Sequence, residues 1–256
     1  MGKKGQSDKS KTSVRAKNKH NLSTRELQLR ENVDQLLKLS TSAGSQQMNI
    51  NKVLESQKEV FEVIDKIKNL EIRKSHSKHT DHVRNSCDKL ASFSDWLKRE
   101  GAIFEGCSIA DFPGYDLGLK ADIDIPFGSL FIAVPKKVMM TIETAKESIL
   151  KNLIEKDQIL KNMPNVTLAI YLLVEKFREN SFFKPYIDIL PRSYCTVLYF
   201  SLAELEELRG SPTLDLALKQ IKSISRQYAY FHTIFSNGDD AVSKLLRPYF
   251  TFEEYW

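Results

Sequence analysis

The sequence predicts an α+β protein that is mainly helical, with a small β part near its middle. Long segments on both sides of residues 103–135 repeat apolar residues at the spacing of three and four that an amphipathic helix requires. Within residues 103–135 apolar and polar residues alternate instead, as they do in half-buried strands. Hydrophobic residues make up 41% of the chain and charged residues 28%, which is ordinary for a globular protein.

The chain opens with a basic segment, which we interpret as a disordered tail over residues 1–22. Its first 20 residues, MGKKGQSDKSKTSVRAKNKH, hold seven basic residues against the single acidic residue Asp8, a charge of +6. The whole chain has a charge of +5, so the rest sums to −1 and predicts no basic binding face. The tail has no aromatic residue that could stack on bases, and we expect no nucleic-acid partner.

The lack of long apolar runs and the spacing of the cysteines indicate in which cellular compartment the protein resides. The sequence has neither the apolar region of a signal peptide nor the run of about 18 apolar residues that spans a membrane, so we expect no membrane partner. Cys87, Cys107 and Cys195 are widely spaced and form no Cys-x-x-Cys pair. This usage indicates a reducing intracellular compartment and argues against a disulfide framework.

Two amphipathic helices follow the tail, over residues 23–39 and from Ile50 to Arg73. Ser23 with Glu26 three residues later is typical of a capping box at the first helix start. Residues 40–47, STSAGSQQ, are typical of a linker. We predict a helical N-terminal extension over residues 23–87, with the two helices paired and packed on the main domain.

A histidine-containing segment comes next. His76, His79 and His82 recur at steps of three, with Asp81 and Cys87 nearby. Helical metal sites favour ligands four residues apart, and steps of three drift around the helix. We therefore predict an exposed polar segment and no metal site.

The β part is preceded by a compact helix, Asp88–Gly101, which the glycine ends. Residues 103–109 then alternate as a strand does, and residues 117–123 alternate again. Pro126-Phe127-Gly128 predicts a turn. SLFIAVP, residues 129–135, predicts a further strand closed by its proline.

Helical patterns return after Thr141. Residues 141–155 predict one helix with a Thr-x-x-Thr start, and Pro164 opens a helix over residues 165–180 whose first half is apolar enough to be buried. The remaining segments predict an irregular aromatic connector, a short helix, a long helix and a final helix start: residues 181–200, 201–209, 213–235 and 251–256.

The order of these segments carries a resemblance. AIFEG, GYDLGLKA and DIDIPFGSLFIAVPKKVMMT follow the helix of Trp96, and LAIYLLVEK, SFFKPYIDILPRSYCTVLYF, SRQYAYF and FTFEEYW come later. In this order they resemble the N-terminal half of a SET domain, in the branch that holds plant Rubisco lysine methyltransferases and animal actin-histidine methyltransferases. SRQYAYF and the opening MGKK favour the actin-histidine group. The resemblance implies a partial SET domain over residues 88–256, with a β-rich part at 88–140 and a helical insert at 141–256.

The resemblance implies a protein methyltransferase that uses S-adenosyl-L-methionine and acts on a histidine of actin. Three alternatives stay open: a lysine methyltransferase of the same family, a non-catalytic chain that binds actin or another protein, and a helical scaffold with a small β-hairpin that binds neither cofactor nor actin. Actin is the implied partner, and the implied location is the cytoplasm, with the nucleus as a second compartment. Positioning and desolvation supply much of the rate in such a reaction, because the donor is already activated.

The resemblance also implies site residues. Tyr115, Asp116, Leu117 and Gly118 would line the cofactor pocket, largely through backbone atoms, with the glycine allowing close approach of the ligand. Arg84 would stand in for a cofactor-binding arginine that the family places near the start of the Trp96 helix. By the same resemblance, a pair on the long helix would lie beside the groove for the peptide substrate: Arg226 and Gln227.

The second half of the family pattern has no counterpart in this sequence. The family continues to an Asn-His segment that grips the cofactor and to a tyrosine beside the transfer channel, and the five histidines here include no Asn-His pair. We assign no catalytic residue. We interpret the chain as a truncated form and expect it to be inactive and marginally stable alone, which methyl transfer by the purified chain would contradict.

Overall fold

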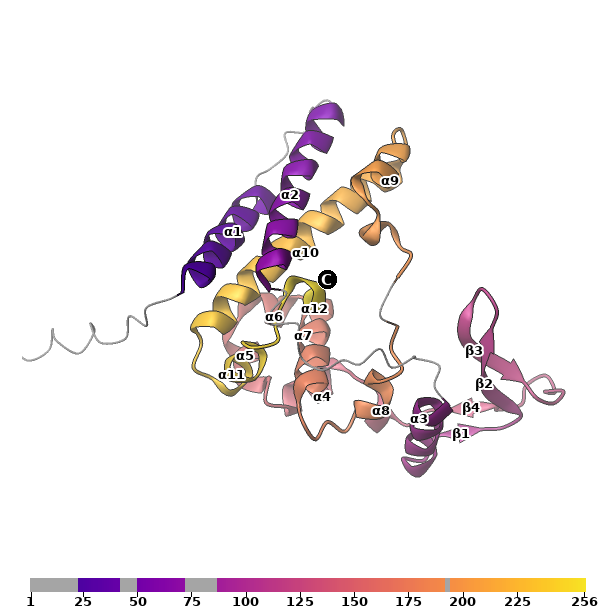
Figure 1. The fold of residues 1–256 in the computed structure, drawn as a ribbon. Helices are drawn as coiled ribbons and strands as arrows, with labels where there is room; N and C mark the ends of the chain where they lie inside the picture. The colour runs from indigo at the N-terminus through magenta and orange to yellow at the C-terminus, as the bar shows by residue number, and fades with distance from the viewer. Residues whose placement is uncertain (1–22, 42–49, 72–86, 192–193) are drawn as a thin grey trace, which may run out of the picture.

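The computed structural model describes residues 23–41, 50–71, 87–191 and 194–256. Helices dominate, and two small sheets lie at one side of the molecule, away from α1 (Figure 1). The predicted fold class, α+β and mainly helical, is confirmed. No helix within the described ranges is long and apolar enough to cross a membrane. The predicted tail and the histidine segment lie outside the described residues.

Helices α1 (Thr24–Thr41) and α2 (Ile50–Glu71) form the predicted antiparallel pair. Near the start of α1, Arg25 Nε donates a 2.7 Å hydrogen bond to the backbone oxygen of Leu70, near the end of α2. Both helices present apolar stripes to the core, and α1 packs on α10 (Pro212–Asn237) as well as on α2 (Figure 1). The pair is therefore joined to the body of the fold.

Side-chain caps start several helices where the sequence predicts them. The Ser23 amide donates to the Glu26 carboxylate at 2.8 Å, and the Glu26 amide donates to the Ser23 hydroxyl at 3.3 Å. Thr141 builds a second capping box at the start of α4 (Ile142–Glu147). The Thr251 hydroxyl accepts a bond from the amide three residues later. Each cap satisfies an amide that has no partner in the first helical turn.

Four short strands form two antiparallel sheets in residues 103–135, which we call the β module. The strands are β1 (Ile103–Phe104), β2 (Cys107–Phe112), β3 (Asp116–Ala121) and β4 (Ile132–Ala133). β1 pairs with β4, and β2 pairs with β3. The predicted turn is present, since the Ser129 amide donates to the Pro126 oxygen at 3.1 Å. The strands on either side of it, however, pair with strands that precede them and not with each other.

Gly106 divides what the alternation predicted as one strand over residues 103–109. Its φ is 72°, in the left-handed region that glycine adopts without a steric penalty. A Cβ at this position would lie 2.5 Å from a side-chain carbon of Ile123. The chain therefore turns between β1 and β2 and lets the residues after β3 pass close by.

The helix predicted over residues 141–155 is interrupted. α4 ends at Glu147, and α5 (Lys151–Lys156) starts anew after Ser148. The Ser148 hydroxyl donates to the Ala145 oxygen at 2.7 Å and accepts from the Leu150 amide at 3.1 Å. Serine side chains offer the backbone such alternatives to helical bonds, and here the alternative prevails.

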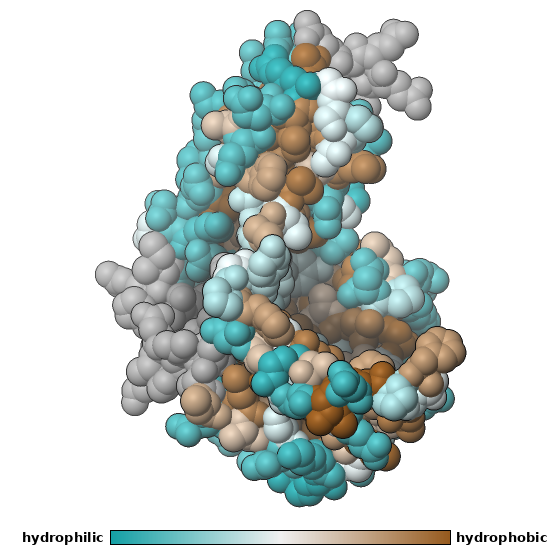
Figure 2. Space-filling view, turned by 90° about the vertical axis from the view of Figure 1, so that its right-hand side faces the viewer, coloured by the Kyte–Doolittle hydropathy of each residue, from teal (hydrophilic) through white to brown (hydrophobic). Residues whose placement is uncertain are grey.

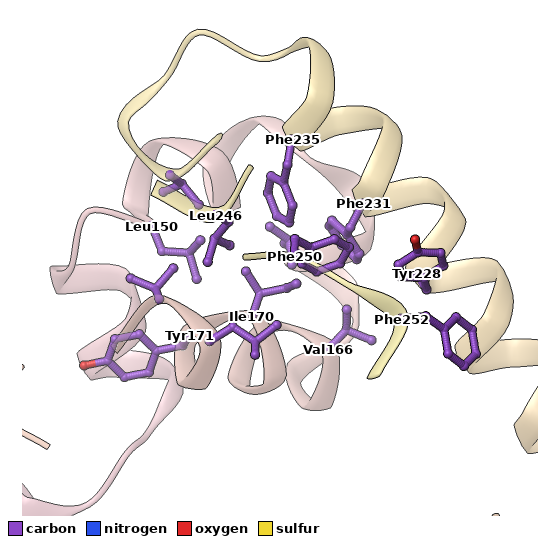
Figure 3. Packing of buried hydrophobic residues seen from close by; sticks show 14 of the residues in the cluster. Leu150, Val166, Ile170, Tyr171, Tyr228, Phe231, Phe235, Leu246, Phe250 and Phe252 are labelled. Carbon is purple, nitrogen blue, oxygen red and sulfur yellow. The ribbon is translucent and has the colours of Figure 1, made fainter. Parts of the chain in front are cut away.

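The core lies between α7 (Pro164–Phe177) and α10 (Figure 3). Ile170 of α7 and Phe231 of α10 are fully buried, and Phe235 packs edge-to-face on Phe250 with ring centroids 4.9 Å apart. Burying one such side chain contributes about 1.5–3 kcal/mol. The prediction that the helix after Pro164 is a buried core helix is confirmed. Further short elements complete this body: η1 (Lys136–Val138), α6 (Gln158–Asn162), α8 (Lys184–Ile187), η2 (Val197–Tyr199), α9 (Leu202–Glu207), α11 (Ala241–Leu246) and α12 (Phe252–Tyr255).

Aromatic packing attaches the β module to this body through α3 (Cys87–Arg99). Trp96 of α3 is 3% exposed and meets Phe182 edge-to-face, with ring centroids 5.4 Å apart. Phe183 is buried beside it and reaches Tyr171 of α7 at 6.1 Å. The predicted irregular aromatic connector thus serves as the contact between α3 and the core.

Candidate functional site

The hairpin β2–β3 presents the predicted cofactor residues at its tip and along its second strand. The Tyr115 amide donates to the Phe112 oxygen at 2.8 Å, which closes the turn between the strands. Phe112 pairs with Asp116 as the last pair of the ladder. Asp116 has a φ of 64°, an uncommon value outside glycine that aspartate tolerates better than most residues. The sequence Pro-Gly-Tyr-Asp is therefore suited to this tight turn.

The exposure of these residues differs along the turn. The Tyr115 side chain is 88% exposed, and Asp116 is exposed as well, whereas Leu117 and Gly118 are half-buried. β3 has no strand partner on its other edge among the described residues. Such an edge offers backbone N–H and C=O groups to a ligand. Backbone recognition, as the sequence analysis expects, is chemically available here.

Gly118 has a second reason to be a glycine. A Cβ there would lie 3.0 Å from the ring of Phe112, which is tighter than ordinary van der Waals contact. The glycine therefore makes room for an aromatic ring of the neighbouring strand. Close approach of a ligand at this position stays a prediction.

The segment around the hairpin is acidic. Residues 105–124 hold five acidic residues and the single basic residue Lys120. The Lys120 ammonium lies 2.9 Å from the Asp122 carboxylate, and its hydrogen bond, followed by one from Ser108, lowers the pKa of Asp122. Asp122 is thus ionised near neutral pH, and the segment as a whole favours a cationic ligand.

Arg226 and Gln227 lie on α10, a helix that Figure 1 shows apart from the β2–β3 hairpin. Arg226 is exposed, and its Nη1 donates to the Ser40 oxygen at 3.4 Å, at the end of α1. Gln227 is half-buried: its Oε1 accepts from Tyr255 Oη at 2.9 Å, and its Nε2 donates to Ser223 Oγ at 3.2 Å. Both side chains therefore contact neighbouring elements, and their role toward a substrate stays a prediction.

The structure does not bring the two predicted sets together in any described contact. Arg84 lies outside the described residues, so the arginine of the cofactor site is not placed. Between the upper helices and the strand end of the molecule the surface is hollowed, and apolar residues gather around the hollow (Figure 2). Within the described residues no group of histidine, cysteine, aspartate or glutamate side chains could hold a metal ion.

Two residues not predicted from the sequence lie near Gln227: Tyr255, which bonds to it, and Glu71, which bonds to the adjacent Tyr228. Glu71 is the last residue of α2 and is 3% exposed. It continues the apolar stripe four residues after Ile67, and a charge on such a stripe is the signal that could have identified it. Its carboxylate accepts a 2.6 Å hydrogen bond from Tyr228 Oη. Burial, and then Glu71, raise the pKa of Tyr228.

Comparison with curated proteins identifies relatives over about two thirds of the chain. Actin-histidine N-methyltransferases from Gallus gallus, Xenopus tropicalis and Homo sapiens are 40%, 39% and 38% identical over 168 residues, or 66% of this chain. The chain spans only 28–29% of the length of these relatives. No family model matches.

Comparison with solved structures identifies the fold. The SET domain of LSMT bound to lysine and AdoHcy aligns with a TM-score of 0.56 and 22% identity, covering 67% of this chain and 37% of that one. Rubisco LSMT bound to sinefungin and monomethyllysine aligns with a TM-score of 0.57 and 23% identity, covering 66% and 38%. The predicted partial SET fold and the resemblance to this branch of methyltransferases are confirmed.

Proposed function

We propose that this chain supplies cofactor- and substrate-contacting parts of a protein methyltransferase that uses S-adenosylmethionine and modifies a histidine of actin. The observation that carries the proposal is the similarity to actin-histidine N-methyltransferases along 168 residues, together with the SET-like fold. We retain the division into an extension at 23–87 and a partial SET domain at 88–256. An actin substrate supports a cytoplasmic location, with the nucleus as a second compartment.

The hairpin fits the cofactor by its chemistry. The outer edge of β3 offers backbone groups of the kind that hold amino-acid and purine moieties, and Tyr115 stands exposed beside it. The acidic segment around it suits a ligand with a positively charged sulfur. Solved structures with this fold bind AdoHcy or AdoMet, which supports the same assignment here.

The cofactor, when bound, supplies a methyl group whose bond to sulfur breaks as a bond to the acceptor nitrogen forms, the sulfur keeping the electron pair. The described residues would bind and orient the reactants. The hairpin would hold the donor, and Arg226 and Gln227 would contact the protein substrate. A histidine acceptor suits such a site, because imidazole is largely neutral near pH 7 and has a nitrogen lone pair available.

A lysine acceptor is the second candidate. Three of the solved structures contain lysine or a methylated lysine with the same fold. Their identity of 22–23% is lower than the 38–40% shared with the actin-histidine enzymes, which favours histidine. The acceptor is therefore tested directly with histidine- and lysine-containing peptides.

The first experiment measures binding of S-adenosylmethionine and of an actin peptide to the full chain by calorimetry, followed by an assay of methyl transfer. Peptides with histidine, with lysine and with alanine at the acceptor position separate the candidates. Binding of both ligands with preference for histidine supports the proposal. Binding of peptide without cofactor favours the non-catalytic alternative, and binding of neither overturns the proposal. Turnover would establish the enzyme and contradict the expected inactivity of the chain alone.

Asp116→Asn tests the cofactor site within the hairpin. Asparagine adopts the left-handed backbone region readily, so the turn at Asp116 should persist while one negative charge is lost. We expect about fivefold weaker binding of S-adenosylmethionine, and a smaller loss for S-adenosylhomocysteine, whose sulfur is uncharged. Asp124→Asn removes the same charge from the same acidic segment and is the matched control. Equal effects of the two variants would argue against a site at the hairpin tip.

A further inference from the structure

Glu71 is a buried carboxylate at a junction of three helices. It ends α2, and its side chain reaches both α10 and the start of α12. Its Oε1 accepts from Tyr228 Oη at 2.6 Å, and its Oε2 accepts from the Phe252 amide at 2.8 Å. A buried carboxylate is costly unless hydrogen bonds compensate for the lost water. These bonds therefore fix Glu71 and its two donors relative to one another.

The bond to Phe252 sets the start of α12. The first amides of a helix have no partner within it, and the Phe252 amide is one of these. Thr251 caps the amide of Glu254, and Glu71 of the N-terminal pair satisfies that of Phe252. α12 carries Tyr255, whose hydroxyl donates to Gln227 Oε1 at 2.9 Å. The carboxylate thus governs where this hydroxyl lies.

The bond to Tyr228 acts on the residue next to Gln227 in the chain. Tyr228 is fully buried, stacks on Phe250 with ring centroids 5.7 Å apart, and meets Phe252 edge-to-face at 5.0 Å. Glu71 is therefore bonded both to α10, which carries Gln227, and to the start of α12, which carries the Tyr255 donor to Gln227. With Oε1 held by Tyr255, the Gln227 amide group points its donors in a fixed direction. Within the part of the chain that the structure describes, one of its two N–H bonds stays available beyond the contact with Ser223.

We propose that Glu71 is a positioning residue for the peptide substrate, and that it acts by fixing Gln227 through Tyr228 and α12. The inference rests on the proposed function, in which Gln227 contacts the substrate. It gives the N-terminal helical pair an indirect role in shaping the substrate site, through Glu71 at the end of α2.

The test compares Glu71→Ala with Glu71→Gln in the full chain. Glutamine can accept from the Phe252 amide and donate to the Tyr228 oxygen, whereas alanine leaves both buried donors unpaired. The probe is a fluorescein-labelled actin peptide that contains the acceptor histidine, and its affinity is measured by anisotropy. We expect about tenfold weaker binding for Glu71→Ala and a change within about twofold for Glu71→Gln.

Tyr230→Phe is the matched structural control. It removes another hydroxyl of α10 that donates to a carboxylate at 2.6 Å, that of Asp157, on a contact that does not involve Gln227. We expect lower stability with unchanged peptide affinity. If Glu71→Ala does not fold, Tyr228→Phe replaces it, since it keeps the ring packing and removes one bond, with about threefold weaker binding expected.

Hydrogen exchange of residues 251–256 gives a readout that does not depend on the substrate. We expect faster exchange of this segment in Glu71→Ala, and wild-type exchange in Glu71→Gln and Tyr230→Phe. Peptide binding by the wild type with equal affinity in Glu71→Ala would overturn the positioning role and leave the proposed function standing. If the wild type binds no peptide, the proposed function fails, and unchanged exchange in Glu71→Ala would overturn the positioning role separately.

Discussion

Pairs of tyrosine hydroxyls and carboxylates fix α10 at the level of single residues. Tyr228 donates to Glu71 and Tyr230 donates to Asp157, each at 2.6 Å. Asp157 also accepts from the first amides of α6, so one carboxylate caps a helix and anchors its neighbour. Burial, and then the hydrogen bond to Asp157, raise the pKa of Tyr230 to about 12.

The raised pKa of Tyr230 predicts a loss of stability in alkaline solution. A tyrosine titrates near pH 10 in the unfolded chain, so its contribution to folding is complete below about pH 10. The contribution is lost as pH rises toward the folded pKa of about 12. We expect the melting temperature to fall over this range, with the fall coinciding with tyrosinate absorbance. Tyr230→Phe should show a smaller fall, and identical pH profiles would contradict the role of this residue.

Local sequence predicts the residues that interact with near neighbours. The capping box of Ser23 and Glu26 joins residues three apart, and a motif of four letters suffices to predict it. The bond from the Phe252 amide to Glu71 joins residues 181 positions apart. No local pattern predicts a contact between residues so far apart in the sequence. Glu71 could therefore be recognised as an unusual charge on an apolar stripe, but its bonding partner could not be predicted.

Short elements depend on single backbone positions. Gly106 has a positive φ and faces Ile123, whereas Gly114, at the hairpin turn, has a φ of 81° and open space where a Cβ would lie. Substitutions at the two glycines therefore separate the free-energy cost of a side chain at positive φ from the cost of a steric clash.

We expect Gly106→Ala to destabilise the β module more than Gly114→Ala. Both variants place a side chain at positive φ, which costs about 1–2 kcal/mol, and only the first also collides with Ile123. Hydrogen exchange of residues 103–133 measures the difference, with the larger increase expected for Gly106→Ala. Equal increases would show that Ile123 moves aside without cost.

Helices were predicted more fully than strands, and the reason is geometric. The apolar stripe after Pro164 predicts α7 because its apolar residues recur three and four positions apart, so a short stretch of sequence contains the whole signal. Alternation over residues 103–135 locates strands, but pairing β4 with β1 requires a chain reversal across the intervening hairpin. The interruption of the predicted helix at Ser148 likewise depends on which of two hydrogen bonds the folded chain selects.

The molecule as a whole combines a buried helical body with a β module that has no buried residue. The described positions from 103 to 135 are all exposed or half-buried, and Ile123 and Leu130 are 64% and 65% exposed. Figure 2 shows apolar surface at this end of the molecule. Because its apolar residues stay largely exposed, the β module gains little free energy of folding from burial.

We expect the β module to open more often than the helical body. Amides of residues 103–133 should exchange at least about tenfold faster than those in the middle of α7 and α10, because few buried contacts oppose local opening. Hydrogen exchange with mass spectrometry on the full chain measures both regions at once. Equal protection of the two regions would contradict the division.

The pairing of β1 with β4 brings both ends of the β module side by side. Ile103 lies opposite Ala133, and Phe104 lies opposite Ile132. Opposed residues of antiparallel strands have Cα atoms only about 4.5–5.5 Å apart. The chain therefore enters and leaves the β module at two adjacent positions on the helical part of the fold. A short designed turn could join these two positions if the module were removed, and a module from another protein could be inserted between them.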